Sequence, residues 1–155
     1  MLQAGEPAPE FTLPDADMEM LALRDFRGKQ CVVLYFYPKD GAPGCIRQAI
    51  DFSDHEDSFI AAGAVVLGVS RDDCLSHGEF RDKHGVSVRL LSDVDAEVCL
   101  QYGVLQTREV EGVVRQGIVR STFIIDRDGV LQHVLYGVKA TGHAAEILKL
   151  VRALH

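Results

Sequence analysis

The segment Cys31-Val32-Val33-Leu34-Tyr35-Phe36-Tyr37 decides the fold. It is an unbroken apolar run that contains β-branched and aromatic residues, and Pro38 ends it. A run of this kind is typical of a strand that is buried on both of its faces. Strands of this type belong to sheets that are covered by helices, so the segment predicts a central strand of an α/β fold.

Strand-like and helix-like segments alternate after this run. Two further buried-strand runs cover residues 64–70 and 88–91. The sequence predicts helices from Cys45 to about Ala62, from Asp72 or Asp73 to about His84, and from Asp93 or Asp95 to Tyr102, each followed by a glycine. This order favours a parallel sheet whose strands are joined by right-handed helical crossovers.

The two ends of the chain carry different signals. Residues 121–125 and 130–136 flank a glycine-containing turn and predict a hairpin, and residues 142–154 show the apolar spacing of one helical face. The proline-punctuated residues 7–14 predict a short edge strand or an extended arm. Residues 107–117 are polar, contain two glycines and give no assignment. We therefore expect a mixed sheet with helices on both faces.

Size and charge narrow the possible functions. The chain has 155 residues, which predicts a single domain over residues 1–155. Its net charge is −7, from 16 basic and 23 acidic residues, and no basic stripe is present, so we expect no nucleic-acid partner. No apolar run reaches the roughly 18 residues of a membrane span, and no signal peptide is visible. We therefore expect a cytoplasmic protein that binds no membrane.

The four cysteines raise the question of a reactive thiol. They are Cys31, Cys45, Cys74 and Cys99, and no pair has the C-x-x-C spacing of a zinc ribbon or a dithiol redox site. Cys45 follows a buried strand and a loop rich in proline and glycine, at the predicted first turn of a helix. The positive end of a helix favours the thiolate form of a cysteine. From position alone, a reactive thiol and a small buried residue that merely packs are equally good interpretations.

The residues around Cys45 resemble a known family. Tyr35-Phe36-Tyr37-Pro38-Lys39-Asp40-Gly41-Ala42-Pro43-Gly44-Cys45 is similar to the active-site segment of the thiol peroxidases called peroxiredoxins, and most similar to the bacterioferritin-comigratory, or Q-type, group. Four further segments match in the same order, at residues 5–14, 68–72, 91–93 and 120–126. The resemblance covers nearly the whole chain and implies a thioredoxin-like fold.

The resemblance also implies a reaction and the residues for it. Cys45 matches the peroxidatic cysteine, Pro38 the proline that shields it, and Arg120 the arginine that pairs with its thiolate. Pro43 and Gly44 bring substrate-binding backbone N–H groups close to the sulfur. The family reduces hydrogen peroxide and organic hydroperoxides, uses a thioredoxin-like or small-thiol reductant, and needs no metal or organic cofactor. We expect a monomer or a weak dimer.

Three positions depart from the family's pattern. Ala42 replaces a threonine or serine whose hydroxyl orients the sulfur and the peroxide. Gln48 replaces a glutamate that anchors the arginine, and Ile50 stands where many Q-type members carry the resolving cysteine. These changes motivate an alternative function, in which a degenerate peroxiredoxin senses peroxide or binds a partner with little turnover. A dithiol oxidoreductase is disfavoured because no C-x-x-C pair is present.

A sulfenic acid on Cys45 would need a second thiol. Cys31 starts the strand that ends at Tyr37, so we expect it on the far side of the sheet, and Cys99 is expected to pack in the core. Cys74 starts the helix after the second strand and is the candidate resolving cysteine, with an external thiol as the rival. The six histidines lack the spacing of metal ligands, and we expect most of them at the surface.

Overall fold

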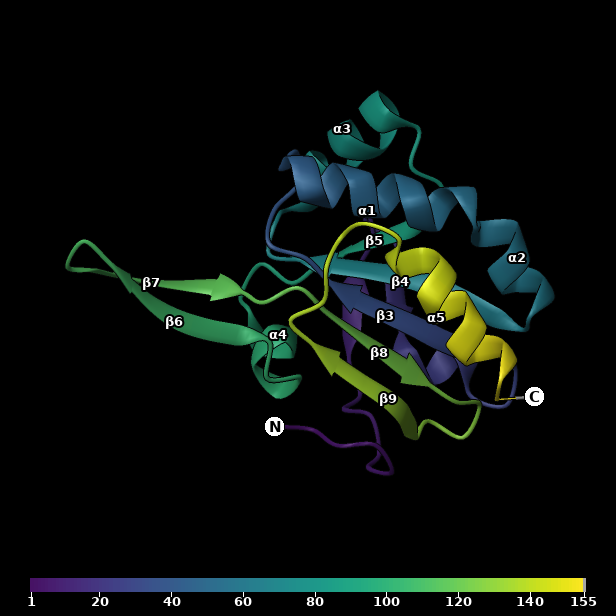
Figure 1. Cartoon of the computed structure of the whole chain (residues 1–155). Helices are drawn as coiled ribbons and strands as arrows, with labels where there is room; N and C mark the ends of the chain where they lie inside the picture. Colours follow the sequence, from purple (N-terminus) through teal and green to yellow (C-terminus); the bar gives the residue numbers. More distant parts are fainter. Residues whose placement is uncertain (155) are drawn as a thin grey trace.

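A central mixed sheet organises the molecule (Figure 1). The computed structural model describes residues 1–154, without the side chains of Arg108 and Val110. The sheet has the strand order β5-β4-β3-β8-β9. Its strands are β3 (Cys31–Phe36), β4 (Ala64–Ser70), β5 (Arg89–Ser92), β8 (Ser121–Ile125) and β9 (Leu131–Tyr136). β3, β4 and β5 are parallel, whereas β8 is antiparallel to β3 and to β9, which confirms the mixed sheet.

The central strand β3 contributes to two separate cores. Val32, Leu34 and Phe36 pack into one hydrophobic cluster, and the alternate residues Val33 and Tyr35 pack into the other. All of these side chains are at most 2% exposed. Because successive residues of a strand point to opposite faces, a strand covered on both sides reads as a continuous apolar run. The strand ends at Phe36, two residues before Pro38, and the chain leaves the sheet at its carboxyl edge.

Helices cover both faces of the sheet, as expected. One face carries α1 (Pro43–Asp54), α2 (Glu56–Ala61), α3 (Cys74–His84) and α5 (His143–Arg152), and Figure 1 shows these four on the same side. The opposite face is covered by α4 (Glu97–Gln101), a short 3-10 helix η1 (Leu23–Phe26), and the small hairpin of β1 (Thr12–Pro14) and β2 (Met20–Ala22). No helix among residues 1–154 is long and apolar enough to cross a membrane.

The helix predicted from Cys45 to Ala62 is wrong in its bounds. The helix begins earlier, at Pro43, because the fixed φ of proline suits the first position of a helix. It is also two helices, α1 and α2, separated at His55. The His55 ring nitrogen Nδ1 lies 2.8 Å from the backbone oxygen of Asp51, so the side chain engages a carbonyl of the last helical turn. Cys45 is therefore the third residue of α1.

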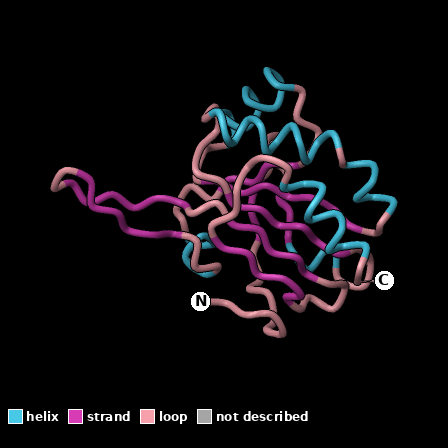
Figure 2. The backbone as a smooth tube through the Cα atoms, in the orientation of Figure 1, coloured by secondary structure: helices cyan, strands magenta, loops and turns pink. Residues whose placement is uncertain are grey.

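The unassigned residues 107–117 belong to a β-hairpin that projects from the body of the molecule (Figures 1 and 2). Its strands are β6 (Leu105–Val110) and β7 (Val113–Ile118). The turn residues Glu111 and Gly112 both have positive φ, 52° and 79°, which suits a tight two-residue hairpin turn. All of β7 except Ile118 is exposed, so this strand has no buried face to impose an alternating pattern.

Candidate active site

Cys45 lies buried at the carboxyl edge of the sheet, in the first turn of α1. Its side chain is 1% exposed and packs in the core cluster beneath α1. The loop between β3 and α1, residues 37–42 and here named the Cys45 loop, delivers the chain from the strand to the helix. The free N–H groups of a helix start and their partial positive charge surround this position. The predicted location of Cys45 at a helix start is confirmed.

Arg120 reaches Cys45 from the start of β8, the strand whose Ser121 pairs with Phe36 at the end of β3. It lies between β7 and β8, and its backbone oxygen accepts a 2.9 Å hydrogen bond from Val138 N–H. Its Nη2 donates toward the Cys45 Sγ at 3.4 Å. The structure thus brings together two residues that the sequence separates by 75 positions. A cation in contact with sulfur stabilises the thiolate over the thiol.

Gln48 holds the same guanidinium. Arg120 Nη1 donates a 2.5 Å hydrogen bond to Gln48 Oε1. Gln48 is fully buried one turn after Cys45 on α1, and its Nε2 is without a partner among the described residues. The amide fixes the position of the guanidinium, but it brings no negative charge to compensate the arginine.

The glycine before the cysteine makes room for the arginine. A Cβ atom on Gly44 would stand 3.1 Å from Arg120 Nη2, tighter than an ordinary contact. Pro43 is the first residue of α1, and Ala42 occupies the N-cap position before it. Ala42 supplies no side-chain hydrogen bond to the helix, whereas a serine or threonine oxygen at an N-cap accepts one from a free N–H group.

An apolar groove borders the site. It has a volume of about 480 Å³ and includes Pro38 and Arg120. The other lining residues are Gly117, Ile118, Val119, Gly137 and Val138. Pro38 therefore lies beside Arg120 at the rim of the site, on the exposed side of the Cys45 loop. A peroxide that approaches Cys45 along this groove passes apolar surface.

The four cysteines are all free thiols, and they differ in their surroundings. Cys74 is half-buried and is the first residue of α3, which follows β4. Because β3 and β4 are parallel neighbours, Cys74 and Cys45 both lie past the carboxyl edge of the sheet. Cys31 and Cys99 are buried core residues, as predicted, and burial raises the pKa of both thiols.

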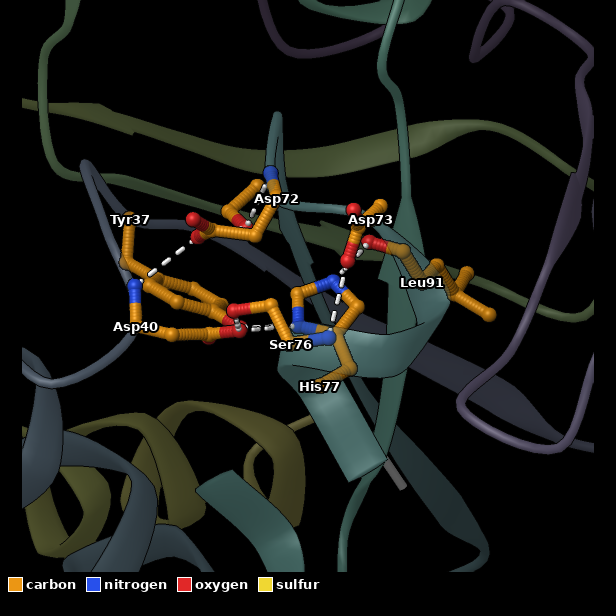
Figure 3. Close-up of polar contacts among 8 residues, drawn as sticks. Tyr37, Asp40, Asp72, Asp73, Ser76, His77 and Leu91 are labelled. Atoms are coloured by element: carbon orange, nitrogen blue, oxygen red, sulfur yellow. Dashed lines mark hydrogen bonds and ion pairs between the residues drawn. The ribbon is translucent and has the colours of Figure 1, made fainter. Parts of the chain in front are cut away.

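A buried polar cluster beside the Cys45 loop was missed from the sequence. His77 and His143 are buried, unlike the surface position expected for most histidines. His77 lies with Asp40 and Asp72 in a group whose potential ligand atoms are within 4.8 Å of one another (Figure 3). Hydrogen bonds inside the cluster already engage these atoms, so they account for the arrangement without a metal. The available signal was the polar residues that end two neighbouring parallel strands.

Comparison with known proteins gives the family of the chain. Residues 4–134 match the model of the AhpC/TSA family. Peroxiredoxin Bcp of Escherichia coli K12 is 40% identical over 151 residues, which is 97% of this chain and 96% of the relative. A Coxiella burnetii relative, also named as a bcp peroxiredoxin, is 46% identical over 147 residues, or 95% and 97% of the two chains.

Solved structures give the same family. The bacterioferritin comigratory protein of Xanthomonas campestris matches with a TM-score of 0.92 at 33% identity, covering 98% of this chain and 99% of that one. A Cys-to-Ser variant of PrxQ from Xylella fastidiosa matches with a TM-score of 0.93 at 34% identity, covering 99% and 98%. The expected thioredoxin-like fold is confirmed by these likenesses. The chain therefore belongs to the AhpC/TSA family and is a peroxiredoxin of the Bcp/PrxQ group.

Proposed function

We propose that this thiol peroxidase acts through Cys45. The Cys45 thiolate attacks one oxygen of a hydroperoxide, the O–O bond breaks, and the sulfur becomes a sulfenic acid. The other oxygen leaves with the bonding electron pair and takes up a proton, giving water or an alcohol. The observation that carries the proposal is the contact between Arg120 Nη2 and the Cys45 Sγ, at a helix start.

The residues around Cys45 have different roles in this step. Arg120 stabilises the thiolate and the negative charge that develops on the departing oxygen. Gly44 and Pro43 shape the backbone whose N–H groups face the reacting atoms, and the absent Cβ at Gly44 leaves space for the guanidinium. Pro38 shields the sulfur from the solvent side. Catalysis of this type depends on donors that are in place before the charge appears.

The substrates are hydrogen peroxide and organic hydroperoxides. The Xanthomonas campestris relative is described in terms of alkyl peroxide reduction activity. The apolar groove beside Pro38 and Arg120 supports the same preference in this chain, because an alkyl group gains free energy when it leaves water for apolar surface. Hydrogen peroxide has no alkyl group and needs only the Arg120 guanidinium and the backbone N–H groups of the same site.

The sulfenic acid is reduced by a thiol. Cys74 is our candidate for an internal resolving cysteine, supported by its place past the same edge of the sheet as Cys45. Because no direct contact joins the two thiols among the described contacts, α3 has to unwind locally before a disulfide forms. A thioredoxin-like protein or a small thiol then returns the enzyme to its reduced form, or resolves the sulfenic acid directly.

We propose that the chain forms one domain, acts in the cytoplasm, binds neither nucleic acid nor membrane, and is a monomer or a weak dimer. The net charge of −7 supports the absence of polyanionic partners.

Peroxide consumption in single-cysteine variants tests the assignment. Cys45→Ser should abolish the reduction of hydrogen peroxide and of cumene hydroperoxide in the presence of excess dithiothreitol. Cys99→Ser, which alters a buried cysteine away from the site, is the matched control and should keep the activity. Consumption that survives Cys45→Ser would refute the role of Cys45.

A further inference from the structure

Asp40 of the Cys45 loop is bound on every side by buried or half-buried partners (Figure 3). Tyr37 Oη donates to Asp40 Oδ1 at 2.7 Å, and Ser76 Oγ donates to Oδ2 at 2.9 Å. His77 Nδ1 lies 2.7 Å from the same Oδ2. The carboxylate is 5% exposed and the imidazole 0%. Ser76 and His77, which both contact the Asp40 carboxylate, belong to the first turn of α3.

The backbone of the loop is held from the same place. Asp40 N–H donates a 2.8 Å hydrogen bond to Asp72 Oδ2, and Ser70 Oγ donates to that oxygen at 2.7 Å. Asp72 and Ser70 lie where β4 ends and the chain turns into α3. Both the backbone and the side chain of Asp40 are thus fastened to the β4–α3 connection.

Both ring nitrogens of His77 face oxygen atoms of other residues. His77 Nε2 lies 2.9 Å from the Leu91 carbonyl oxygen, which only accepts hydrogen bonds. Nδ1 faces the Asp40 carboxylate, which also accepts when it is ionised. Burial alone would raise the pKa of Asp40, but the hydrogen bond and the charge of His77 outweigh burial and hold that pKa below its ordinary value.

We propose that Asp40 and His77 are positioning residues whose buried contact latches the Cys45 loop to the first turn of α3. Asp40 stands three residues before Pro43, the first residue of α1. By fixing Asp40, the latch fixes the direction in which the chain enters α1 and so the backbone that presents Cys45 to peroxide. This role rests on the proposed reaction at Cys45, and it extends the site to α3.

Two isosteric changes at His77 separate the latch from general packing. Along the side chain, the amide nitrogen of asparagine stands where Nδ1 stands in histidine, and that of glutamine stands where Nε2 stands. His77→Asn therefore keeps a donor for Asp40 and loses the bond to Leu91. His77→Gln keeps the donor for Leu91 and loses the bond to Asp40. A merely structural role of His77 would make the two variants equally harmful.

The first measurement needs no chemistry at Cys45. Amide hydrogen exchange of residues 37–46, followed by mass spectrometry, reports how often the loop opens. We expect exchange about tenfold faster in His77→Gln than in His77→Asn, in line with the loss of one charge-assisted hydrogen bond. Asp73→Ala is the matched control, because the Asp73 side chain caps α3 through Ser76 N–H and makes no hydrogen bond to the loop within residues 1–154. Equal exchange in the two His77 variants would overturn the latch.

The second measurement asks whether the latch positions Cys45. The rate of Cys45 oxidation by hydrogen peroxide in stopped flow should be about tenfold lower in His77→Gln than in His77→Asn. Loosened exchange with equal oxidation rates would contradict the positioning role. If His77→Gln fails to fold, Asp40→Ala removes the same contact from the loop side, and the same effects are expected. A wild-type protein that does not react with peroxide would contradict the proposed function, while exchange still decides the latch.

Discussion

Arg120 donates a 2.5 Å hydrogen bond to Gln48, and this buried partner is uncharged. The other terminal nitrogen of the guanidinium lies 3.4 Å from the Cys45 Sγ. An amide orients the arginine without neutralising it, so the full positive charge acts on the sulfur. A carboxylate in the same place would compete with the thiolate for that charge.

We therefore predict that Gln48→Glu lowers the rate at which Cys45 is alkylated at neutral pH. The added negative charge in this buried site disfavours a second anion on the neighbouring sulfur. The rate of alkylation by iodoacetamide should fall, and its rise with pH should move to higher pH. Gln48→Leu is the control, because it removes the hydrogen bond without adding a charge and so should not move the profile in this direction. A Gln48→Glu profile that coincides with wild type would show that Gln48 acts only by position.

Ala42 deprives the start of α1 of a side-chain hydroxyl. Because it caps α1 without a side-chain hydrogen bond, Ala42→Thr should stabilise the fold by about 1 kcal/mol, or roughly 2–4 °C in Tm. If the hydroxyl also bonds the reacting oxygens, the gain of ~1.5–3 kcal/mol corresponds to roughly tenfold to over a hundredfold in the rate of Cys45 oxidation. Stopped-flow oxidation and thermal unfolding measure the two effects.

Ala42→Val separates the hydroxyl from the shape of threonine. Neither the stability nor the rate should rise in this variant. A fast wild-type rate that threonine barely improves would mean that Arg120 and the backbone donors suffice. A slow wild-type rate that threonine restores would favour the alternative of a peroxide sensor with little turnover.

The sheet could be predicted from the sequence because its strands are buried on both faces. In such strands every residue is apolar, so the runs at 31–37 and 64–70 stand out without any knowledge of their neighbours. The hairpin of β6 and β7 was not found for the opposite reason. It projects from the body of the molecule, and exposed strands carry no pattern that burial enforces.

Some residues of the site could likewise be predicted from the sequence, and others could not. Cys45 could be located from the local order of strand, loop and helix, and Arg120 only from the family resemblance. The contact between Asp40 and His77 joins segments 37 residues apart and depends on the pairing of β3 with β4. Nothing local distinguishes His77 from an exposed histidine, because its burial is decided by how α3 packs on the sheet.

Cys74 is predicted to resolve the sulfenic acid. After one equivalent of hydrogen peroxide, peptide mapping under non-reducing conditions should show a Cys45–Cys74 disulfide, and Cys74→Ser should leave Cys45 as a trapped sulfenic acid. Cys31→Ser, at the opposite end of β3, is the control and should still form the disulfide. An intramolecular disulfide that persists in Cys74→Ser would exclude this role, and turnover without any disulfide would indicate an external thiol.

His143 is predicted to make stability fall as the pH is lowered below neutral. Its side chain is 3% exposed, and its Nε2 lies 2.7 Å from Thr122 Oγ1. Burial, helped by the charge of Arg120 and opposed by Glu146 and Asp51, lowers the pKa of His143 in the folded protein. When the pH falls below the ordinary histidine pKa of about 6.5, His143 is therefore protonated in the unfolded chain while it is still neutral in the folded chain.

The sign of this effect can be measured directly. The contribution of His143 is fully present above pH 6.5 and is lost as the pH falls toward its lowered folded-state pKa, with a slope of at most about 1.4 kcal/mol per pH unit for one proton. Urea unfolding at pH 7.5 and 5.5 should show a smaller drop in stability for His143→Gln than for wild type, since glutamine does not titrate. His133→Gln, on strand β9, is the control and should keep the wild-type drop. Equal drops in all three proteins would mean that the buried ring at position 143 takes up its proton as readily in the folded chain as in the unfolded one.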